Sequence, residues 1–461
     1  MSINSNPANH SQVIHNPIPN KSAVCVLIGH SIEAITSAVV LASLGQPVHL
    51  YADIATLERN LQQYSFERHL QALWQLYTQQ QQIISRPLAD NAAALIKNYE
   101  VPKTADKNTE NAPSTAQLYW LFLESIQNDW SDDSWITAFN HSQQQTLPLI
   151  ISGIEALGHI AALAARLQRA WVYYVPFVFL QDGDAYSSML KPSLWLLGEK
   201  TPQSSHKLTA LQPLMQYAQA QHTADIATIE FARSSIMAML ATRVSFMNEM
   251  SRLADSHQLD IQAVSHIMGL DKRVGSSYLQ AGWGFGGHTL PQELDKLQQS
   301  GQTKSVAMPL LQSVMHINED QKELIFRKFW QYFDGFIDNK TVMIWGGSYK
   351  SGSGRTAGSA IHPLLKLLWS YNIRTLVYSD QATPELAAHY GHEPLLHLLD
   401  TPYQQLAAVQ AIFIISWSAK DRLDIDTLNQ QALPIFDARN TFTRPQIDAL
   451  IGDYIGIGRA K

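Results

Sequence analysis

The chain has 461 residues, of which 46% are hydrophobic, with 33 basic and 39 acidic side chains and a formal charge of −6. This length and composition predict two or three globular domains and exclude a wholly disordered chain, and the acidic balance does not suit nucleic acid as a partner. The single cysteine, Cys25, excludes a disulfide framework and a cysteine-based metal site, and we expect no metal. No apolar run approaches the ~20 residues of a membrane span, so we expect no membrane insertion and a cytoplasmic location.

The N-terminal part of the chain predicts a tail followed by an α/β domain. Residues 1–22 are rich in Asn, Ser, Pro and His and lack a continuous apolar core, so we expect a disordered tail and no signal peptide. An apolar run at 23–28 predicts a strand that ends at Gly29, and helical apolar spacing over 32–44 predicts a helix. A second strand at 48–51 completes a strand, glycine turn, helix and strand, which is the start of a parallel sheet.

The rest of this first domain, which we place at 23–215, is less regular. The polar, Gln-rich stretch from 54 to about 112 predicts helix and loop, and the runs 148–152 and 172–180 predict later strands of the same sheet. We expect a Rossmann-like, dinucleotide-type domain, in which ligands bind at the carboxyl ends of the strands.

A helical middle follows, which we place at 216–335. Residues 223–258 contain no Gly or Pro and have apolar residues at three- and four-residue spacing, so they predict one long helix. A second helix is predicted over about 305–333, and the glycine-rich loop 281–287 lies between the two.

From 336 to 461 the opening pattern is repeated. A strand at 341–345 is followed by Gly346 and Gly347 and by a helix over 359–371. Further strands are predicted at 373–378, 411–415 and 433–436. The sequence therefore predicts an α/β fold with two Rossmann-like parallel-sheet domains, joined by a central helical domain with one long helix.

The strongest local signal is the loop from Tyr278 to Gly287, with the sequence YLQAGWGFGG. Four glycines within six positions allow its backbone to approach a ligand closely and to direct N–H groups at it. Other motifs occur in order along the chain: FLQDG at 179–183, ATRVSFMNE at 241–249, RVG at 273–275, PLL at 309–311, RTAGS at 355–359, FDARN at 436–440 and IGIGR at 455–459.

Together these motifs resemble the UDP-glucose/GDP-mannose 6-dehydrogenase family over nearly all of the chain after residue 22. The resemblance implies oxidation of the C6 alcohol of a nucleotide sugar to a carboxylate, with NAD as the cofactor and polysaccharide biosynthesis as the pathway. It also implies a homodimer formed through the long central helix.

The family's catalytic positions fall on altered residues. The nucleophilic cysteine falls on Thr289, whose hydroxyl is hardly ionised near neutral pH, and the lysine of the central helix falls on Arg233, which stays protonated. One acidic position is retained as Asp182, and the acid of the Lys-Asp pair after the cysteine becomes Glu293. The coordinated change at these positions argues against the four-electron oxidation.

The dinucleotide fingerprint G-x-G-x-x-G is also altered, because its three positions fall on Gly29, Ser31 and Ala34. Alanine suits the third position, but the Cβ atom of Ser31 lies where the backbone must approach a pyrophosphate. Glu33 adds negative charge at a helix N-terminus that favours anions, and the ribose-binding acid is displaced by one residue, to Asp53. We expect a Rossmann fold retained without cofactor, with NAD binding through these residues as the alternative.

The positions that bind the substrate in the family are better retained. They are Arg273, Tyr278, Leu279, Gly284, Phe285, Gly286, Gly287, Lys350, Arg355 and Arg439. Arginine forks and lysine charges suit a diphosphate, so we expect this set to bind a nucleotide sugar.

Three functional interpretations follow from these residues. The first, which we favour, is a family member that binds a nucleotide sugar with lost or much reduced oxidation activity. The second is an active NAD-dependent nucleotide-sugar dehydrogenase with a rearranged site. The third is a structural or interaction protein that binds no ligand.

Overall fold

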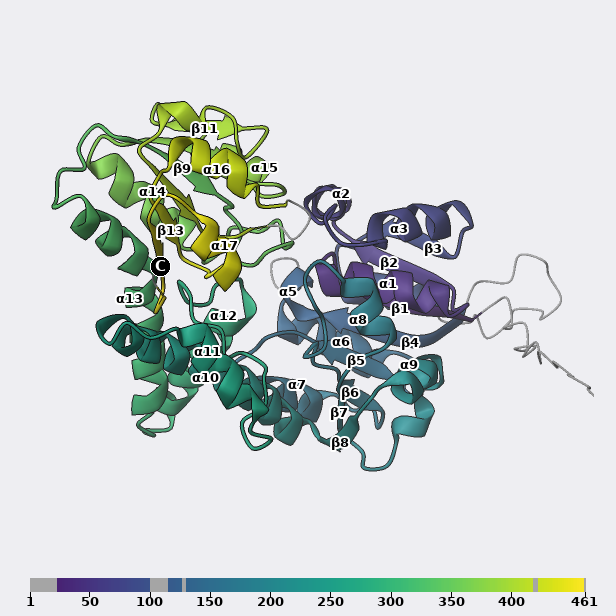
Figure 1. Ribbon diagram of the computed structural model, residues 1–461. Coiled ribbons are helices and arrows are strands. Elements are labelled where there is room, and N and C mark those ends of the chain that lie inside the picture. Colours follow the sequence, from purple (N-terminus) through teal and green to yellow (C-terminus); the bar gives the residue numbers. More distant parts are fainter. Residues whose placement is uncertain (1–22, 100–114, 127–129, 418–421, 460–461) are drawn as a thin grey trace, which may run out of the picture.

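The computed structural model describes residues 23–99, 115–126, 130–417 and 422–459. Figure 1 shows two sheets side by side, one in purple to teal and one in green to yellow, with long helices where they meet. Both sheets are mainly parallel, and the predicted fold class is confirmed. The predicted tail at 1–22 and the end of the Gln-rich stretch, 100–112, lie outside the described residues.

The N-terminal sheet has eight strands in the order β3-β2-β1-β4-β5-β6-β7-β8, and its neighbouring strands are parallel except for β6 and β7. Its strands are β1 (Ala23–Ile28), β2 (Val48–Ala52), β3 (Ile83–Pro87), β4 (Thr115–Phe122), β5 (Leu149–Ser152), β6 (Val172–Tyr174), β7 (Trp195–Glu199) and β8 (Gln221–Asp225). The connecting helices are α1 (Ile32–Ser43), α2 (Ile54–Gln63), α3 (Leu70–Gln79), α4 (Ala92–Lys97), α5 (Leu123–Ile126), α6 (Asp132–His141), α7 (His159–Arg166), α8 (Ala185–Leu190), η1 (Ser205–Lys207), η2 (Thr209–Leu211) and α9 (Gln212–Tyr217).

The first strand is buried on both faces of this sheet. Val24, Val26 and Ile28 belong to one core, and Cys25 and Leu27 belong to the other, as the two-residue period of a strand requires. Double burial explains why this strand is a continuous apolar run. Burial also raises the pKa of Cys25 to about 12, so its thiol stays protonated and is no nucleophile.

Four helices form the central region: α10 (Ile226–Ser256), α11 (Ile261–Leu270), α12 (Thr289–Thr303) and α13 (Pro309–Tyr332). The predicted long helix is α10, which begins where the Asp225 carboxylate accepts a hydrogen bond from the Thr228 amide at 2.9 Å. In the parts of the chain that the structure describes, no helix is both long enough and apolar enough to cross a membrane.

The C-terminal sheet has six parallel strands in the order β11-β10-β9-β12-β13-β14. They are β9 (Thr341–Trp345), β10 (Arg374–Tyr378), β11 (Leu396–Leu399), β12 (Ala411–Ile414), β13 (Ile435–Asp437) and β14 (Tyr454–Gly456). The helices are α14 (Ile361–Ser370), α15 (Thr383–Tyr390), η3 (Leu406–Ala408), α16 (Ile425–Gln431) and α17 (Arg444–Ala449). Counted from its first strand, β9, this sheet has the same strand order as β3-β2-β1-β4-β5-β6 of the first sheet. Both sheets therefore have the doubly wound arrangement.

Two sequence predictions were wrong in detail. The stretch 54–112, predicted as helix and loop, also contains the edge strand β3. The run 172–180, predicted as a strand, is extended only over Val172–Tyr174. Pro176 stands two residues after Tyr174 and has no N–H group for a ladder, so the strand does not continue past it.

Buried amide side chains from two long helices hold the glycine-rich loop. Asn248 of α10 accepts a hydrogen bond from the Gly282 amide at 2.9 Å. Asn318 of α13 accepts from the Phe285 amide at 2.7 Å and donates to the Phe285 carbonyl at 3.1 Å. Gly284 has a φ of 111°, and a Cβ atom there would lie 2.4 Å from Oδ1 of Asn318, so only glycine fits.

We predict that Asn318→Ala lowers the free energy of unfolding by about 2–4 kcal/mol, because it leaves two buried backbone groups of Phe285 without partners. Urea denaturation would measure the change. The matched control is Gln312→Ala on the exposed face of the same helix, which should change stability by less than about 0.5 kcal/mol. Equal effects of the two substitutions would contradict the anchoring role.

Candidate functional site

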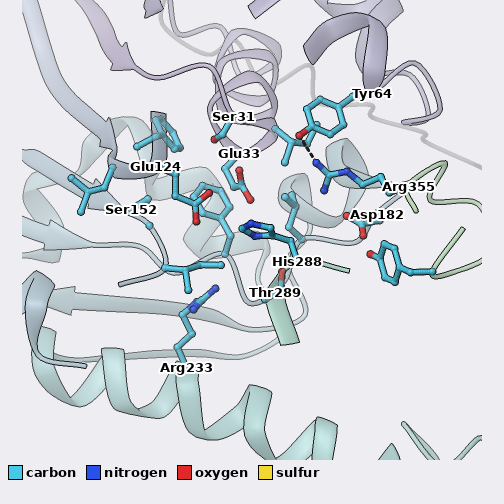
Figure 2. Close-up of a pocket in the computed structure, with 18 residues that line it drawn as sticks. Ser31, Glu33, Tyr64, Glu124, Ser152, Asp182, Arg233, His288, Thr289 and Arg355 are labelled. Atoms are coloured by element: carbon cyan, nitrogen blue, oxygen red, sulfur yellow. Dashed lines mark hydrogen bonds between the residues drawn. The ribbon is translucent and has the colours of Figure 1, made fainter. Parts of the chain in front are cut away.

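A cavity of about 240 Å³ lies where the two sheet-bearing parts meet α10 and α12. Its wall comes from the carboxyl ends of β1, β4 and β5, from α10, from the start of α12 and from the loop after β9 (Figure 2). The charged or titratable groups on this wall are Glu33, Glu124, Asp182, Arg233, His288 and Arg355. Ligands of open α/β sheets bind at such a position, so we treat this interdomain pocket as the candidate site.

The pocket brings together five residues that the sequence singled out. They are Ser31, Asp182, Arg233, Thr289 and Arg355. Glu293, a sixth, lies against Arg233 and is fully buried. Gly29 and Ala34 flank Ser31 in the turn and the first part of α1.

Three backbone donors in and after the turn between β1 and α1 have side-chain acceptors within the protein. The hydroxyl of Ser125 accepts hydrogen bonds from the amides of His30 at 3.0 Å and Ser31 at 3.1 Å. The Ser31 hydroxyl accepts from the Ala34 amide at 3.4 Å and caps α1. In nucleotide-binding turns such N–H groups face the ligand's phosphates, whereas here their acceptors belong to the protein.

Three carboxyl groups line the pocket: Glu33, Glu124 and Asp182. Within the described residues none of the three forms an ion pair. The Glu124 side chain is exposed toward the pocket, and the surrounding protein atoms remove part of its hydration. This desolvation, and then the nearby charge of Glu33, raises the pKa of Glu124 to about 7.

Both arginines on the pocket wall have interaction partners within the protein. Arg233 forms a buried ion pair with Glu293, and the Ser234 hydroxyl donates to the same carboxylate at 2.8 Å. Arg355 stacks over the ring of Tyr64, with its guanidinium carbon 4.6 Å from the ring centroid, and donates a hydrogen bond to the Tyr64 hydroxyl. Arg233 therefore carries little net charge toward a ligand, and Arg355 is held by an aromatic partner.

Thr289 begins α12 and lines the pocket beside His288. Its hydroxyl makes no hydrogen bond to any described residue. Burial, followed by the charge of Arg355, lowers the pKa of His288 below its ordinary value, so the imidazole is neutral at neutral pH. Nothing in this arrangement ionises the threonine hydroxyl.

Contacts between the N-terminal and C-terminal parts close one side of the pocket. Gln63 at the end of α2 donates to Glu385 of α15 at 3.1 Å. The other oxygen of Glu385 accepts from the amide and the hydroxyl of Thr356 at 2.7 and 2.8 Å. The neighbouring Arg355–Tyr64 contact joins the same two parts.

Several predicted site residues lie outside the pocket. The Arg273 side chain is 89% exposed and pairs with Asp271 two residues away. Asp53 caps α2 by accepting from the Thr56 amide at 2.8 Å. Arg439 is partly buried, lies 4.2 Å over the Trp283 ring and donates to the carbonyls of Gly284 and Tyr349. Each of these side chains thus has a partner in the protein.

The glycine-rich loop packs against protein at most of its predicted positions. A Cβ atom on Gly287 would lie 2.7 Å from the Tyr349 ring, and one on Gly286 would lie 2.5 Å from the Gly358 carbonyl oxygen. The remaining predicted positions divide between core and surface: Leu279 and Phe285 are buried, and Tyr278 and Lys350 are exposed. The glycines here permit one chain segment to lie close to another.

Three residues of the site escaped the sequence analysis: Tyr64, Glu124 and Ser125. Glu124 and Ser125 follow the strand β4 directly, and a polar pair after an apolar strand is a usable signal for a site. Because β4 was not among the strands predicted from the sequence, Glu124 and Ser125 could not be recognised as residues at a strand end. Tyr64 follows α2 and leaves no pattern in the sequence.

A second, much smaller cavity of about 20 Å³ lies at the carboxyl ends of β9, β10 and β12. Ser348, Ser379 and Ser416 line it, together with Asp380. The Gly347 amide donates to the Ser379 hydroxyl at 3.1 Å. This crevice is the equivalent, in the second sheet, of the ligand position in the first.

A family model matches the middle of the chain. Residues 227–320 match the model of the UDP-glucose/GDP-mannose dehydrogenase family, central domain. A UDP-glucose 6-dehydrogenase of Pseudomonas aeruginosa is 28% identical over 290 residues, which are 61% of this chain and 64% of that protein. One of Rickettsia bellii is 26% identical over 61% of this chain and 65% of its own length. The matches thus span less than two thirds of these relatives.

Solved structures share the fold over almost the whole chain. A UDP-glucose dehydrogenase from the archaeon Pyrobaculum islandicum has a TM-score of 0.76 and 18% identity, covering 96% of this chain and 100% of that one. A UDP-D-ManNAc dehydrogenase from Pyrococcus horikoshii has a TM-score of 0.71 and 13% identity, with 95% and 99% covered. The architecture is that of nucleotide-sugar dehydrogenases. By sequence, the chain is similar to the UDP-glucose/GDP-mannose dehydrogenase family, whose central domain matches residues 227–320.

We predict that Glu124→Gln changes how stability depends on pH. The folded pKa of about 7 lies above the ordinary value of 4.5, so the native protein carries a penalty that is full above about pH 7 and absent below about pH 4.5. The substitution should therefore stabilise the protein at pH 8 and leave it unchanged at pH 4.5. Because the side chain is open to solvent, we expect a gain of at most about 1 kcal/mol.

Thermal unfolding of both proteins across this pH range would measure the difference. Glu230, which caps α7 and whose pKa is also raised to about 7, is present in both proteins and cancels in the comparison. A Glu124→Gln protein with the same advantage at both pH values would contradict the raised pKa.

Proposed function

We propose that this protein binds a nucleotide sugar and does not carry out the four-electron oxidation of the family. The observation that carries the proposal is Thr289 on the pocket wall, at the position of the family's cysteine, with its hydroxyl hydrogen-bonded to no base among the described residues. A nucleophile must trap the aldehyde so that a second hydride can leave, and a neutral threonine hydroxyl does this poorly.

Arg233, on the same pocket wall as Thr289, also argues against the four-electron oxidation. Arg233 stands where the family has a lysine, and its guanidinium is tied to Glu293. Arginine can stabilise a developing negative charge but does not exchange protons near neutral pH. A buried ion pair is also costly to break, because the remaining partner would be left as an unpaired buried charge.

The dinucleotide side of the pocket supports the proposal independently. A pyrophosphate would have to displace the Ser125 hydroxyl from two backbone amides. It would also bring two negative charges close to Glu33 and Glu124, which line the same pocket. We therefore propose that NAD is not bound in the family's manner.

Support for the sugar nucleotide comes from the similarity to nucleotide-sugar dehydrogenases and from the C-terminal sheet. The crevice after β9, β10 and β12 offers hydroxyl groups from Ser348, Ser379 and Ser416 at the usual ligand position of such a sheet. The loop after β9 also reaches the interdomain pocket through Tyr349 and Arg355. A nucleotide held at the second sheet could thus present its sugar toward the pocket.

We predict that purified protein is stabilised by UDP-glucose in a thermal-shift assay and forms no NADH when NAD⁺ is added. Thr289→Cys should also form no NADH, because the thiol alone restores neither a proton acceptor nor a free phosphate-binding turn. The P. aeruginosa UDP-glucose 6-dehydrogenase serves as the active control. NADH and uronate formation by the unchanged protein would contradict the proposal.

A homodimer through α10 is part of the same proposal. Phe231, Met239, Phe246 and Leu253 are all exposed on this helix, and their spacing of seven or eight residues puts them on one face. We predict a dimer in light scattering and a monomer for the Met239→Glu, Phe246→Glu double variant. A monomeric unchanged protein would contradict this part.

A further inference from the structure

The electrostatics of the interdomain pocket suggest which chemical group its ligand carries. Three carboxyl groups line it, and the Arg233 charge is balanced by Glu293. Among the described lining residues, Arg355 is the only cation without a carboxylate at ion-pair distance, and His288 is neutral at neutral pH. The pocket therefore has an excess of negative charge, which disfavours an anionic group and favours a cationic one.

Two of the carboxyl groups face the same space. Glu33 comes from the first turn of α1, and Glu124 comes from the residues that follow β4. Figure 2 shows both side chains extending toward the interior of the pocket, near His288, with Asp182 on the side of Arg355. A small group that donates several hydrogen bonds could reach Glu33 and Glu124 together, which a protonated amine does with its three donors.

A separate observation concerns a buried donor. The Arg233 side chain is only 5% exposed, and its Nε atom has no hydrogen-bond partner among the described residues. The guanidinium lines the pocket and in Figure 2 extends from α10 toward it. Nε itself has almost no accessible surface, so a ligand would meet the guanidinium nitrogens on the pocket side, for which a hydroxyl or ring oxygen of a sugar is a suitable acceptor.

We propose that the pocket receives an amino sugar with a free amine, whose ammonium lies between Glu33 and Glu124 and whose oxygen accepts from Arg233. This inference rests on the proposed function, because it names the sugar of the nucleotide sugar bound there. A divalent cation is a weaker fit, since no group of three metal-ligating side chains occurs within the residues that the structure describes. An acetamido or hydroxyl group at the same position would leave the carboxylates without a charge partner.

The test compares UDP-glucosamine, UDP-glucose and UDP-N-acetylglucosamine by calorimetric titration at pH 7. We expect UDP-glucosamine to bind at least about tenfold more tightly than the other two. In a Glu33→Gln, Glu124→Gln double variant this preference should fall to within about twofold. Glu58→Gln, an exposed substitution on α2 outside the pocket, is the matched control and should keep the preference.

Each outcome has a distinct meaning. Equal affinity for the three nucleotide sugars would overturn the amine inference and leave the proposed function standing. A preference that survives in the double variant would also overturn it. If no nucleotide sugar binds, the proposed function fails. In that case, thermal unfolding with free glucosamine or glucose at millimolar concentration tests whether the pocket binds an amine. Stabilisation by glucosamine alone supports the amine site, and any other result overturns it.

Discussion

The hydroxyl of Ser125 accepts hydrogen bonds from the backbone amides of His30 and Ser31 at the end of β1. The strand order places β4 beside β1, so a residue 95 positions away in the chain reaches this turn. Backbone donors that are satisfied within the protein gain little from binding a phosphate. Glu33 and Glu124 border the space beside the turn, so this contact ties the turn to the segment that carries Glu124.

The altered residues form one connected site. Arg233 of α10 pairs with Glu293 of α12, and Thr289 lies one turn before Glu293 on the same helix. On the opposite wall, Arg355 is held by Tyr64. The fold of nucleotide-sugar dehydrogenases is retained, while the residues that meet in its central pocket differ in charge and in proton chemistry. Fold and activity can separate in this way because the site is a small part of the packed structure.

The fold was largely predictable because its strongest signals are local. The apolar run before Gly29 and the similar run at Thr341–Trp345 are each buried on both faces of a parallel sheet. The site was only partly predictable, since Thr289 and Arg233 stand in recognisable motifs but Ser125 and Tyr64 act through sequence-distant partners. Arg439 carried a misleading signal, because an arginine that donates to carbonyl groups looks the same in sequence as one that binds phosphate.

We propose that the first sheet offers no dinucleotide site. Calorimetric titration of NAD⁺ into the unchanged protein tests this most directly, because it requires neither catalysis nor knowledge of the sugar. We predict no saturable heat up to millimolar NAD⁺, since the amides of His30 and Ser31 have their acceptor in Ser125. Saturable binding with a micromolar dissociation constant would contradict the claim.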